Sequence, residues 1–349
     1  MISFAEYIWM DGAQPTQKLR SKTRVVCLQE GQQATLELFP EWSYDGSSTY
    51  QAAGGSSDLV LKPVYFRPDP LKAEQGHFIV MCEVFHADGT PHKTNSRARL
   101  REVLSAGADK LGAWFGFEQE YTLMKGHTPL GWPEMGFPAP QGPFYCGVGC
   151  DEAFGRQMVD EHAAKCVAAE LLIFGTNAEV MPGQWEFQIG YRGFPGESAD
   201  PLTVCDQLWL ARWLLYRVGE SYNIAATLHP KPVKGDWNGA GLHTNFSTDD
   251  MRSKETGRHT IEKVIRSLGE THQLHIPEYG DRLAERLTGT HETCSINEFR
   301  SGASDRGASI RIPLTVAREG YGYLEDRRPG ANADPYRIAA RILKTIIES

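Results

Sequence analysis

Four glutamates stand in apolar, strand-like sequence, and they constrain the fold of this chain more than any other feature. They occur in two short stretches, residues 117–120 and 178–187. Glutamate side chains are seldom buried unless they are paired with a cation or bind a metal ion. The simplest explanation for these carboxylates is therefore a divalent cation site, and their number favours more than one ion.

The composition is that of an ordinary soluble protein of two domains. The chain has 349 residues, of which 41% are hydrophobic and 23% are charged. Its net charge of −8 argues against a nucleic-acid partner, and no apolar run reaches the ~18 residues of a membrane span. The seven cysteines are odd in number and lie mostly in apolar runs, and no secretory signal is visible at the N-terminus. We therefore expect buried, reduced thiols and a cytoplasmic location.

The first 90 residues are predicted to form short strands joined by loops. The apolar or alternating segments that indicate strands are 25–28, 35–39, 58–61 and 78–85. A turn at Asp88-Gly89 and a polar stretch then lead into a helix that ends near Gly107. This change in pattern places a domain boundary near residue 91, giving domains 1–90 and 91–349.

The second part alternates helices with strands. Asp151 is expected to cap a helix that runs to about Phe174, with Gly175 as its stop. Asp200-Pro201 and Asp334-Pro335 each combine an N-cap with a proline at the first helical position. The helix after Pro201 is apolar on nearly every side, which predicts a helix in the core.

Polar residues recur at every second position in several of the expected strands. Because side chains at i and i+2 share one face of a strand, such residues point the same way. Glu179 and Glu186 flank the turn signal Pro182-Gly183, so they are expected to face each other across a hairpin. The other alternating sets are Glu118 and Glu120; His243, Asn245 and Ser247; Ser309 and Arg311; and Glu325 and Arg327. Five strands could thus offer polar faces to one cavity.

Electrostatic repulsion indicates what such a cavity would contain. Two carboxylates ~4 Å apart repel by about 4 kcal/mol at an effective dielectric constant near 20. Five glutamates without cations would therefore cost more than the ~5–15 kcal/mol stability of a whole domain. Oxygen ligands with one imidazole suit Mg²⁺ or Mn²⁺ rather than structural zinc, and Mg²⁺ is typically shared with a phosphate substrate.

Four arginines near these segments supply the complementary charge: Arg286, Arg306, Arg311 and Arg327. Guanidinium groups match phosphate and carboxylate oxygens with two parallel hydrogen bonds. Any single glutamate–arginine pair is more often a surface salt bridge. Metal ligands and arginines around one pocket, however, are the equipment of phosphoryl transfer.

Several longer motifs resemble those of glutamine synthetase, in particular the short type II enzymes. They are EWSYDGSST at 41–49, WFGFEQEY at 114–121, NAEVMP at 177–182, NGAGLHTN at 238–245, HET at 291–293 and EDRRP at 325–329. The resemblance implies an α+β protein with an N-terminal β-grasp domain and a C-terminal catalytic domain built on a curved antiparallel sheet. It also implies a homo-oligomer, commonly a decamer of two pentameric rings, with active sites shared between subunits.

The resemblance further assigns roles by matching position. Two to three Mg²⁺ or Mn²⁺ ions would bind at each site, one to Glu120, Glu179 and Glu186, and a second to Glu118, His243 and Glu325. The implied ATP contacts are Glu118, Glu186, His243, Asn245, Ser247, Arg306, Arg311 and Tyr323. Glutamate would contact Trp237, Asn238, Gly239, Arg286, Arg306 and Arg327. Ammonium would contact Asp45, Ser48, Tyr145 and Glu292, and the catalytic residues would be Asp45, Glu292, Arg306 and Arg327.

The implied reaction joins ammonia to L-glutamate in two steps. ATP phosphorylates the γ-carboxylate to γ-glutamyl phosphate, and ammonia then displaces phosphate to give glutamine. A flap bearing Glu292 is expected to close over the intermediate, because an acyl phosphate hydrolyses when water enters. Two alternatives remain open: a γ-glutamyl ligase that uses an organic amine, and a catalytically silent paralogue that acts as a sensor or structural ring.

Overall fold

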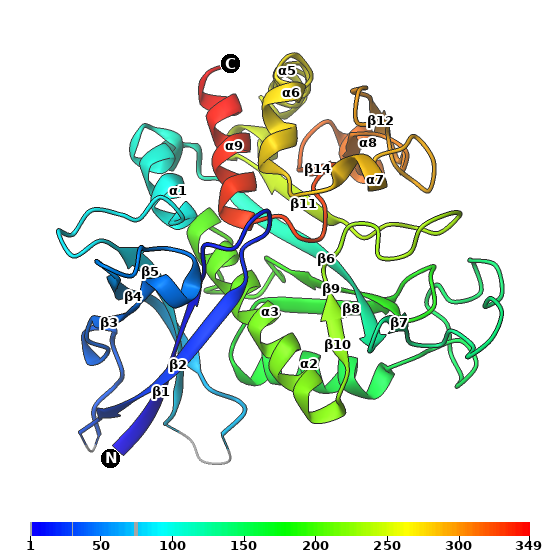
Figure 1. Ribbon diagram of the computed structural model, residues 1–349. Helices are drawn as coiled ribbons and strands as arrows, with labels where there is room; N and C mark the ends of the chain where they lie inside the picture. The colour runs from blue at the N-terminus through cyan, green and yellow to red at the C-terminus, as the bar shows by residue number, and fades with distance from the viewer. Residues whose placement is uncertain (1, 30, 73–75) are drawn as a thin grey trace.

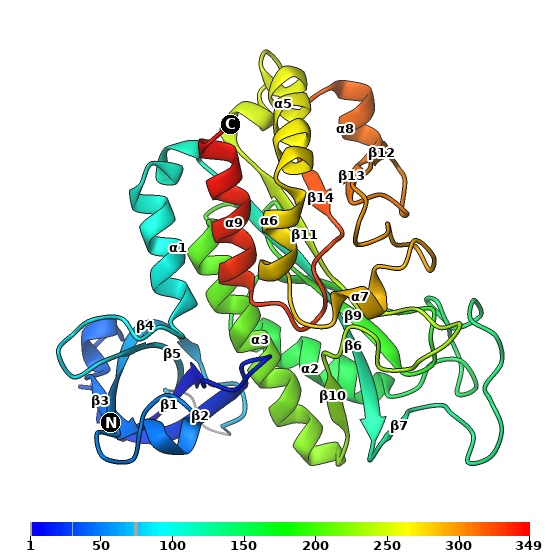
Figure 2. The same cartoon turned by 45° about the horizontal axis from the view of Figure 1, so that its top comes forward.

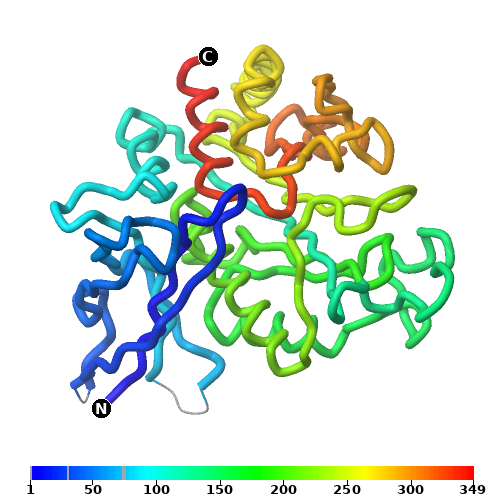
Figure 3. Tube along the Cα trace, viewed as in Figure 1, coloured from blue at the N-terminus to red at the C-terminus, as the bar shows by residue number. Residues whose placement is uncertain are grey.

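Two β-sheets, joined by helices, make up the computed structural model, which describes residues 2–29, 31–72 and 76–349 (Figure 1). The chain completes the first sheet before it enters the second, as the change from blue to green shows (Figure 3). Within the described ranges, we find no helix long and apolar enough to cross a membrane.

The N-terminal sheet has five strands among the described residues, and the last of them in the sequence lies at its centre. Its order is β2 (Leu19–Cys27), β1 (Ile2–Met10), β5 (Phe78–Phe85), β4 (Asp58–Pro68) and β3 (Trp42–Asp45). The central pair β1–β5 is parallel, and the other pairs are antiparallel. Alternation along β1 buries Tyr7 and Trp9 in a core of this sheet, whereas Ile8 and Met10 join the main core of the second part.

The predicted strand at 35–39 is wrong. This segment forms the 3₁₀ turn η1 (Leu36–Leu38), and a second 3₁₀ turn, η2 (Gly46–Thr49), follows β3. The backbone hydrogen bonds of this segment are made within it and not to a neighbouring strand. The amides of Leu38 and Phe39 donate to the carbonyls of Thr35 and Leu36 at 3.1 and 3.0 Å. An apolar run therefore indicated burial of Phe39 but not the backbone conformation.

The second sheet forms the floor of the site. Its order is β12 (Ser301–Ala303), β13 (Ile310–Ile312), β14 (Leu324–Asp326), β11 (Leu242–Ser247), β6 (Trp114–Lys125), β9 (Gln184–Ile189) and β8 (Ile173–Ala178). Two short strands, β7 (Thr128–Pro129) and β10 (Ala225–Thr227), also pair with β6. The sheet is antiparallel, as expected, apart from one edge, where β12 and β13 run parallel.

The longer helices lie on one face of this sheet and leave the other to the site (Figure 2). α3 (Pro201–Tyr222) lies against β6 and β9, and α9 (Pro335–Ile347) packs on it. The remaining helical segments are α1 (Ser96–Ser105), η3 (Ala108–Leu111), α2 (Arg156–Ala168), α4 (Asp249–Arg252), α5 (Gly257–Glu270), α6 (His272–His275), η4 (Ile276–Glu278), α7 (Leu283–Arg286) and α8 (Leu314–Glu319). As predicted, α3 is buried along most of its length.

Helix caps were predicted with mixed success. Asp200 and Asp334 accept hydrogen bonds from the amides of Thr203 and Tyr336, both at 3.0 Å, so both of these N-caps are confirmed. The helix expected from Asp151 to Phe174 is present, but both of its predicted ends are wrong. α2 begins after Gly155, whose φ is +84°, and ends where the Leu171 amide turns back onto the Cys166 carbonyl at 3.0 Å.

Phe174 and Gly175 therefore belong to β8 rather than to a helix end.

The expectation of reduced, buried cysteines is correct for the free thiols and for the burial of four of the seven. All seven are free, but Cys27, Cys146 and Cys150 are exposed. The other four are buried.

Candidate functional site

A cavity of about 320 Å³ opens on the face of the second sheet that the longer helices leave free. Strand register explains why acidic residues meet there. Glu118 on β6 lies opposite His243 on β11, and Glu120 lies opposite Glu186 on β9. Asn245 lies opposite Glu325 on β14, which extends the same face. The predicted convergence of polar strand faces is thus present in the fold.

Two groups of these side chains have ligand atoms within 4.8 Å of one another. One group is Glu118, His243 and Glu325, and the other is Glu120, Glu186 and His243. His243 belongs to both, so the two groups are contiguous. Glu179 lines the same cavity but is in neither group.

The register of the hairpin explains the place of Glu179. In the β8–β9 hairpin, Asn177 lies opposite Glu186. The expectation that Glu179 and Glu186 face each other is therefore wrong. Glu179 stands one residue beyond β8, where its amide donates to the Gln184 carbonyl at 2.9 Å. The Asn177 amide group then holds the Glu179 carboxylate at 3.0 Å.

Crowding of buried carboxylates shifts their protonation toward the neutral form. Burial, followed by the charge of Glu120, raises the pKa of Glu179 to about 8. Burial and the neighbouring carboxylates raise the pKa of Glu186 well above its ordinary value, and burial also raises the pKa of Glu120. Burial and nearby arginines lower the pKa of His243, which keeps its imidazole neutral. Neutral imidazole and closely spaced carboxylate oxygens are a donor set that fits Mg²⁺ or Mn²⁺.

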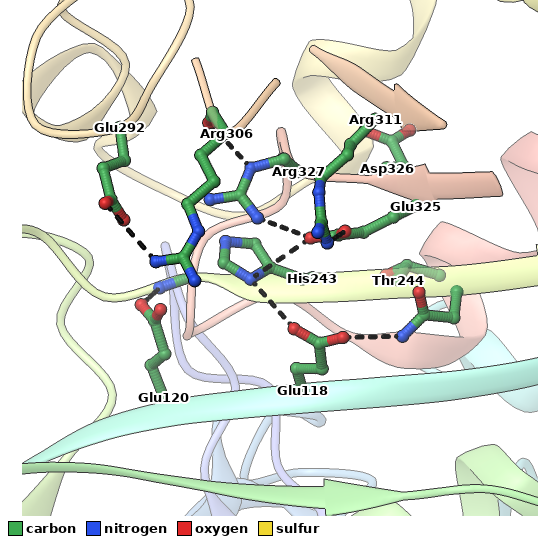
Figure 4. A network of polar contacts seen from close by, with 12 residues as sticks. Glu118, Glu120, His243, Thr244, Glu292, Arg306, Arg311, Glu325, Asp326 and Arg327 are labelled. Atoms are coloured by element: carbon green, nitrogen blue, oxygen red, sulfur yellow. Dashed lines mark hydrogen bonds and ion pairs between the residues drawn. The ribbon is translucent and has the colours of Figure 1, made fainter. Parts of the chain in front are cut away.

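Arginines form the other wall of the cavity (Figure 4). Arg311 and Arg327 both donate to Glu325, at 2.7 and 2.5 Å. Arg306 lies 3.5 Å from Glu292. The buried Arg286 lies 3.1 Å from the Nε2 atom of His243. All four predicted arginines are therefore at or beside the cavity.

The predicted ammonium residues are only partly assembled within one chain. Tyr145 and Glu292 line the cavity, and the Arg306 guanidinium lies 5.8 Å from the centre of the Tyr145 ring. Asp45 is instead the last residue of β3, and Ser48 lies in η2 directly after it, at the edge of the N-terminal sheet that faces away from β6 (Figure 1). Hydrogen bonds from Ser47 and Ser48 lower the pKa of the exposed Asp45 to about 2.

A second cavity of about 450 Å³ adjoins the first, and Glu118 lines both. It contains the predicted nucleotide residues Asn245, Ser247 and Tyr323. Its walls also include Trp114 and other aromatic rings. Aromatic walls beside a charged cavity suit a planar base attached to phosphates.

The predicted glutamate residues Trp237, Asn238 and Gly239 form a loop beside the first cavity. Gln141 accepts a hydrogen bond from the Asn238 amide at 2.6 Å, and Gln184 donates to the Gly239 carbonyl at 2.8 Å. Gly239 is packed closely, because a side chain there would meet Arg286. These bonds fix the loop next to the arginine that the sequence linked with it.

Three residues that line the first cavity were not predicted from the sequence: Phe174, Asn177 and Gln188. Gln188 donates to Asn177 at 2.6 Å and also contacts Glu186. The i, i+2 rule could have found Gln188 from Glu186 and Asn177 from Glu179. Phe174 could not be found, because it was placed at the end of a helix.

Comparisons with known proteins agree with this geometry. Residues 1–87 match the family model "Glutamine synthetase, beta-Grasp domain", and residues 93–263 match "Glutamine synthetase, catalytic domain". The chain is similar to the glutamine synthetase of Streptomyces viridochromogenes, with 53% identity over 98% of this chain and 96% of that protein. The chloroplastic glutamine synthetase of Chlamydomonas reinhardtii is 51% identical over 99% and 90%, respectively.

A solved structure supports the fold independently. The cryo-electron microscopy structure of Plasmodium falciparum glutamine synthetase superposes with a TM-score of 0.76 and 15% identity, covering 99% of this chain and 71% of that one. The expected β-grasp domain and curled catalytic sheet are therefore confirmed.

The fold and the cavity define this chain as a ligase, an enzyme that couples bond formation to the use of a nucleotide. The two family models and the relatives at about 50% identity narrow this class further. The chain belongs to the glutamine synthetase family, the glutamate–ammonia ligases, as its motifs predicted.

Proposed function

We propose that the first cavity binds two or more divalent cations and catalyses ATP-dependent amidation of L-glutamate by ammonia. The observation that carries this proposal is the pair of contiguous ligand groups that share His243. The residues that would hold the ions are Glu118, Glu120, Glu179, Glu186, His243 and Glu325. Bound Mg²⁺ or Mn²⁺ would neutralise phosphate charge and orient the nucleotide for transfer.

The protein's own side chains would orient both substrates. ATP would occupy the second cavity, with its base against the walls that include Tyr323 and its phosphates toward Arg311 and Arg306. Glutamate would lie between Arg327 and the Trp237–Gly239 loop beside Arg286. Arg306 then faces the γ-carboxylate from the side of Glu292, where it can stabilise charge on the transferring phosphoryl group.

Ammonium would bind between Glu292, Tyr145 and Asp45, and Asp45 would take its proton. Asp45 is exposed and strongly acidic, and it lies away from the cavity of its own chain. We therefore propose that Asp45 and Ser48 complete the site of an adjacent subunit in a ring, with a decamer as the expected assembly. We also propose a domain boundary near residue 91 and a cytoplasmic location.

Phosphate release with ATP, Mg²⁺ and glutamate, measured with and without ammonium, tests the proposal. Strong dependence on ammonium supports ammonia as the acceptor. Release that depends instead on an added organic amine would favour the γ-glutamyl ligase alternative. No release under any condition would favour the catalytically silent alternative.

A further inference from the structure

A buried arginine on the helix side of the second sheet makes no hydrogen bond or salt bridge to a carboxylate among its described contacts, although the charge of Asp334 acts on it. Arg212 on α3 is only 1% exposed. It donates to the side-chain carbonyl of Gln119 at 2.7 Å and to the backbone carbonyls of Ala331 and Ala333 at 3.1 and 2.9 Å. The ring of Trp209 lies 4.6 Å from its guanidinium carbon.

Such a group is costly to keep in a core. Burial lowers the pKa of Arg212 to about 10, which shows how strongly its surroundings disfavour the charge. Apolar side chains of similar size commonly stabilise a core at least as well as buried charged groups do. A role in fold stability alone therefore does not account for an arginine at this position.

Gln119 connects this arginine with the proposed metal site. It lies on β6 between Glu118 and Glu120, and its side chain points to the opposite face from theirs. Its amide nitrogen donates to the backbone carbonyl of Glu120 at 2.8 Å and to that of Ala331 at 3.1 Å. Arg212 therefore orients the amide that fixes the backbone of Glu120.

The same network reaches the carboxylate of Glu120 by a second route. The amide of Ala331 donates to the carbonyl of Ala240 at 3.0 Å, which anchors the segment that enters β11. The next residue, Gly241, donates from its amide to the Glu120 carboxylate at 2.5 Å. The Glu120 amide in turn donates to the Gly241 carbonyl at 3.1 Å. Glu120 is thus held at its backbone and at its carboxylate.

We infer that Arg212 and Gln119 are positioning residues that orient Glu120 for a divalent cation from the far side of the sheet. This inference rests on the proposed function, because it requires Glu120 to be a metal ligand. Residues that orient ligands typically change metal affinity by 10- to 100-fold when they are replaced. Their replacement is expected to weaken metal binding more than it alters the fold.

Titration calorimetry of the full-length protein with Mn²⁺ alone tests the inference. Arg212→Lys keeps the charge but loses the planar fork, and Gln119→Met conserves volume but removes the amide. Each variant is expected to bind Mn²⁺ roughly tenfold more weakly than wild type. A high Mn²⁺ concentration is expected to restore its turnover.

Arg97→Lys is the matched control. Arg97 is also buried and also contacts α3, but it pairs with the carboxylates of Glu83 and Asp206, away from β6. This variant is expected to unfold at a lower temperature in EDTA and to bind Mn²⁺ with wild-type affinity.

The outcomes separate the inference from the proposed function. Wild-type Mn²⁺ affinity in both test variants would overturn the inference and leave the metal site standing. An equal loss of affinity in the Arg97→Lys control would also overturn it, because the effect would then be general. A wild-type protein that binds no Mn²⁺ would overturn the proposed metal site and the inference together.

Discussion

Replacing Glu179 by glutamine is expected to stabilise the metal-free protein while it weakens metal binding. The Glu179 carboxyl group is largely buried beside Glu120, and its pKa rises from 4.5 to about 8 in the folded protein. A carboxyl group with a raised folded pKa contributes stability that is fully present below pH 4.5. That stability is lost as the pH rises through about 8.

The size of the effect follows from the two pKa values. At 1.36 kcal/mol for each tenfold change, the rise from 4.5 to about 8 corresponds to about 5 kcal/mol at high pH. Glutamine carries no charge, so Glu179→Gln removes this loss. The unfolding entropy is about 2.1 cal/mol/K per residue, and the chain has 349 residues. A free-energy change of about 5 kcal/mol therefore corresponds to a rise of roughly 5–7 °C in melting temperature.

Thermal unfolding at pH 5 and pH 9, in EDTA and in saturating Mg²⁺, measures both sides of this prediction. In EDTA at pH 9 the variant should melt above wild type, and the difference should shrink toward pH 5. Mg²⁺ should raise the melting temperature of wild type by more than that of the variant. Glu134→Gln, at an exposed position, is the control and should change nothing. A variant that melts below wild type in EDTA at pH 9 would refute the reasoning.

Three further predictions concern the site and its support. Glu292→Ala should lower the rate of glutamine formation by about 100-fold, while calorimetry should find nucleotide binding intact; an equal loss of both would contradict a role in the second step. Diluted monomers should be inactive, and mixing inactive Asp45→Asn and Glu120→Gln subunits should restore part of the activity; failure of every mixture would contradict the shared site. Arg97→Ala should lower the free energy of unfolding by about 3–5 kcal/mol in thermal or urea unfolding, because it removes the arginine that pairs with the buried Asp206, while Glu83 keeps its pairing with Arg101. A loss below about 1 kcal/mol would show that Asp206 finds another partner.

Alternation along the strands allowed much of the site to be predicted. Glu118 and Glu120 were placed on one face by a local rule that holds wherever β6 pairs, so no knowledge of its partners was needed. Asp200 and Asp334 marked helix starts for a similar reason, since capping bonds span only a few residues. The matching motifs then supplied the family.

Local patterns failed where the outcome depended on a partner. Segment 35–39 has strand-like composition but forms a turn, with its hydrogen bonds made locally. Glu179 was expected opposite Glu186, yet the hairpin register places Asn177 there. Register depends on packing across both faces of the sheet, and a slip of one residue reverses every side chain.

The sequence by itself determined which residues could carry the chemistry, because strand periodicity and helix caps are encoded within a few neighbouring positions. Only the tertiary structure decided that His243 stands between two groups of carboxylates, and that Arg212 supports Glu120 from the opposite face. The contacts of His243 with Glu118 and of Arg212 with Gln119 join residues 125 and 93 positions apart. Their geometry is set by how sheet and helices pack, which local sequence does not encode.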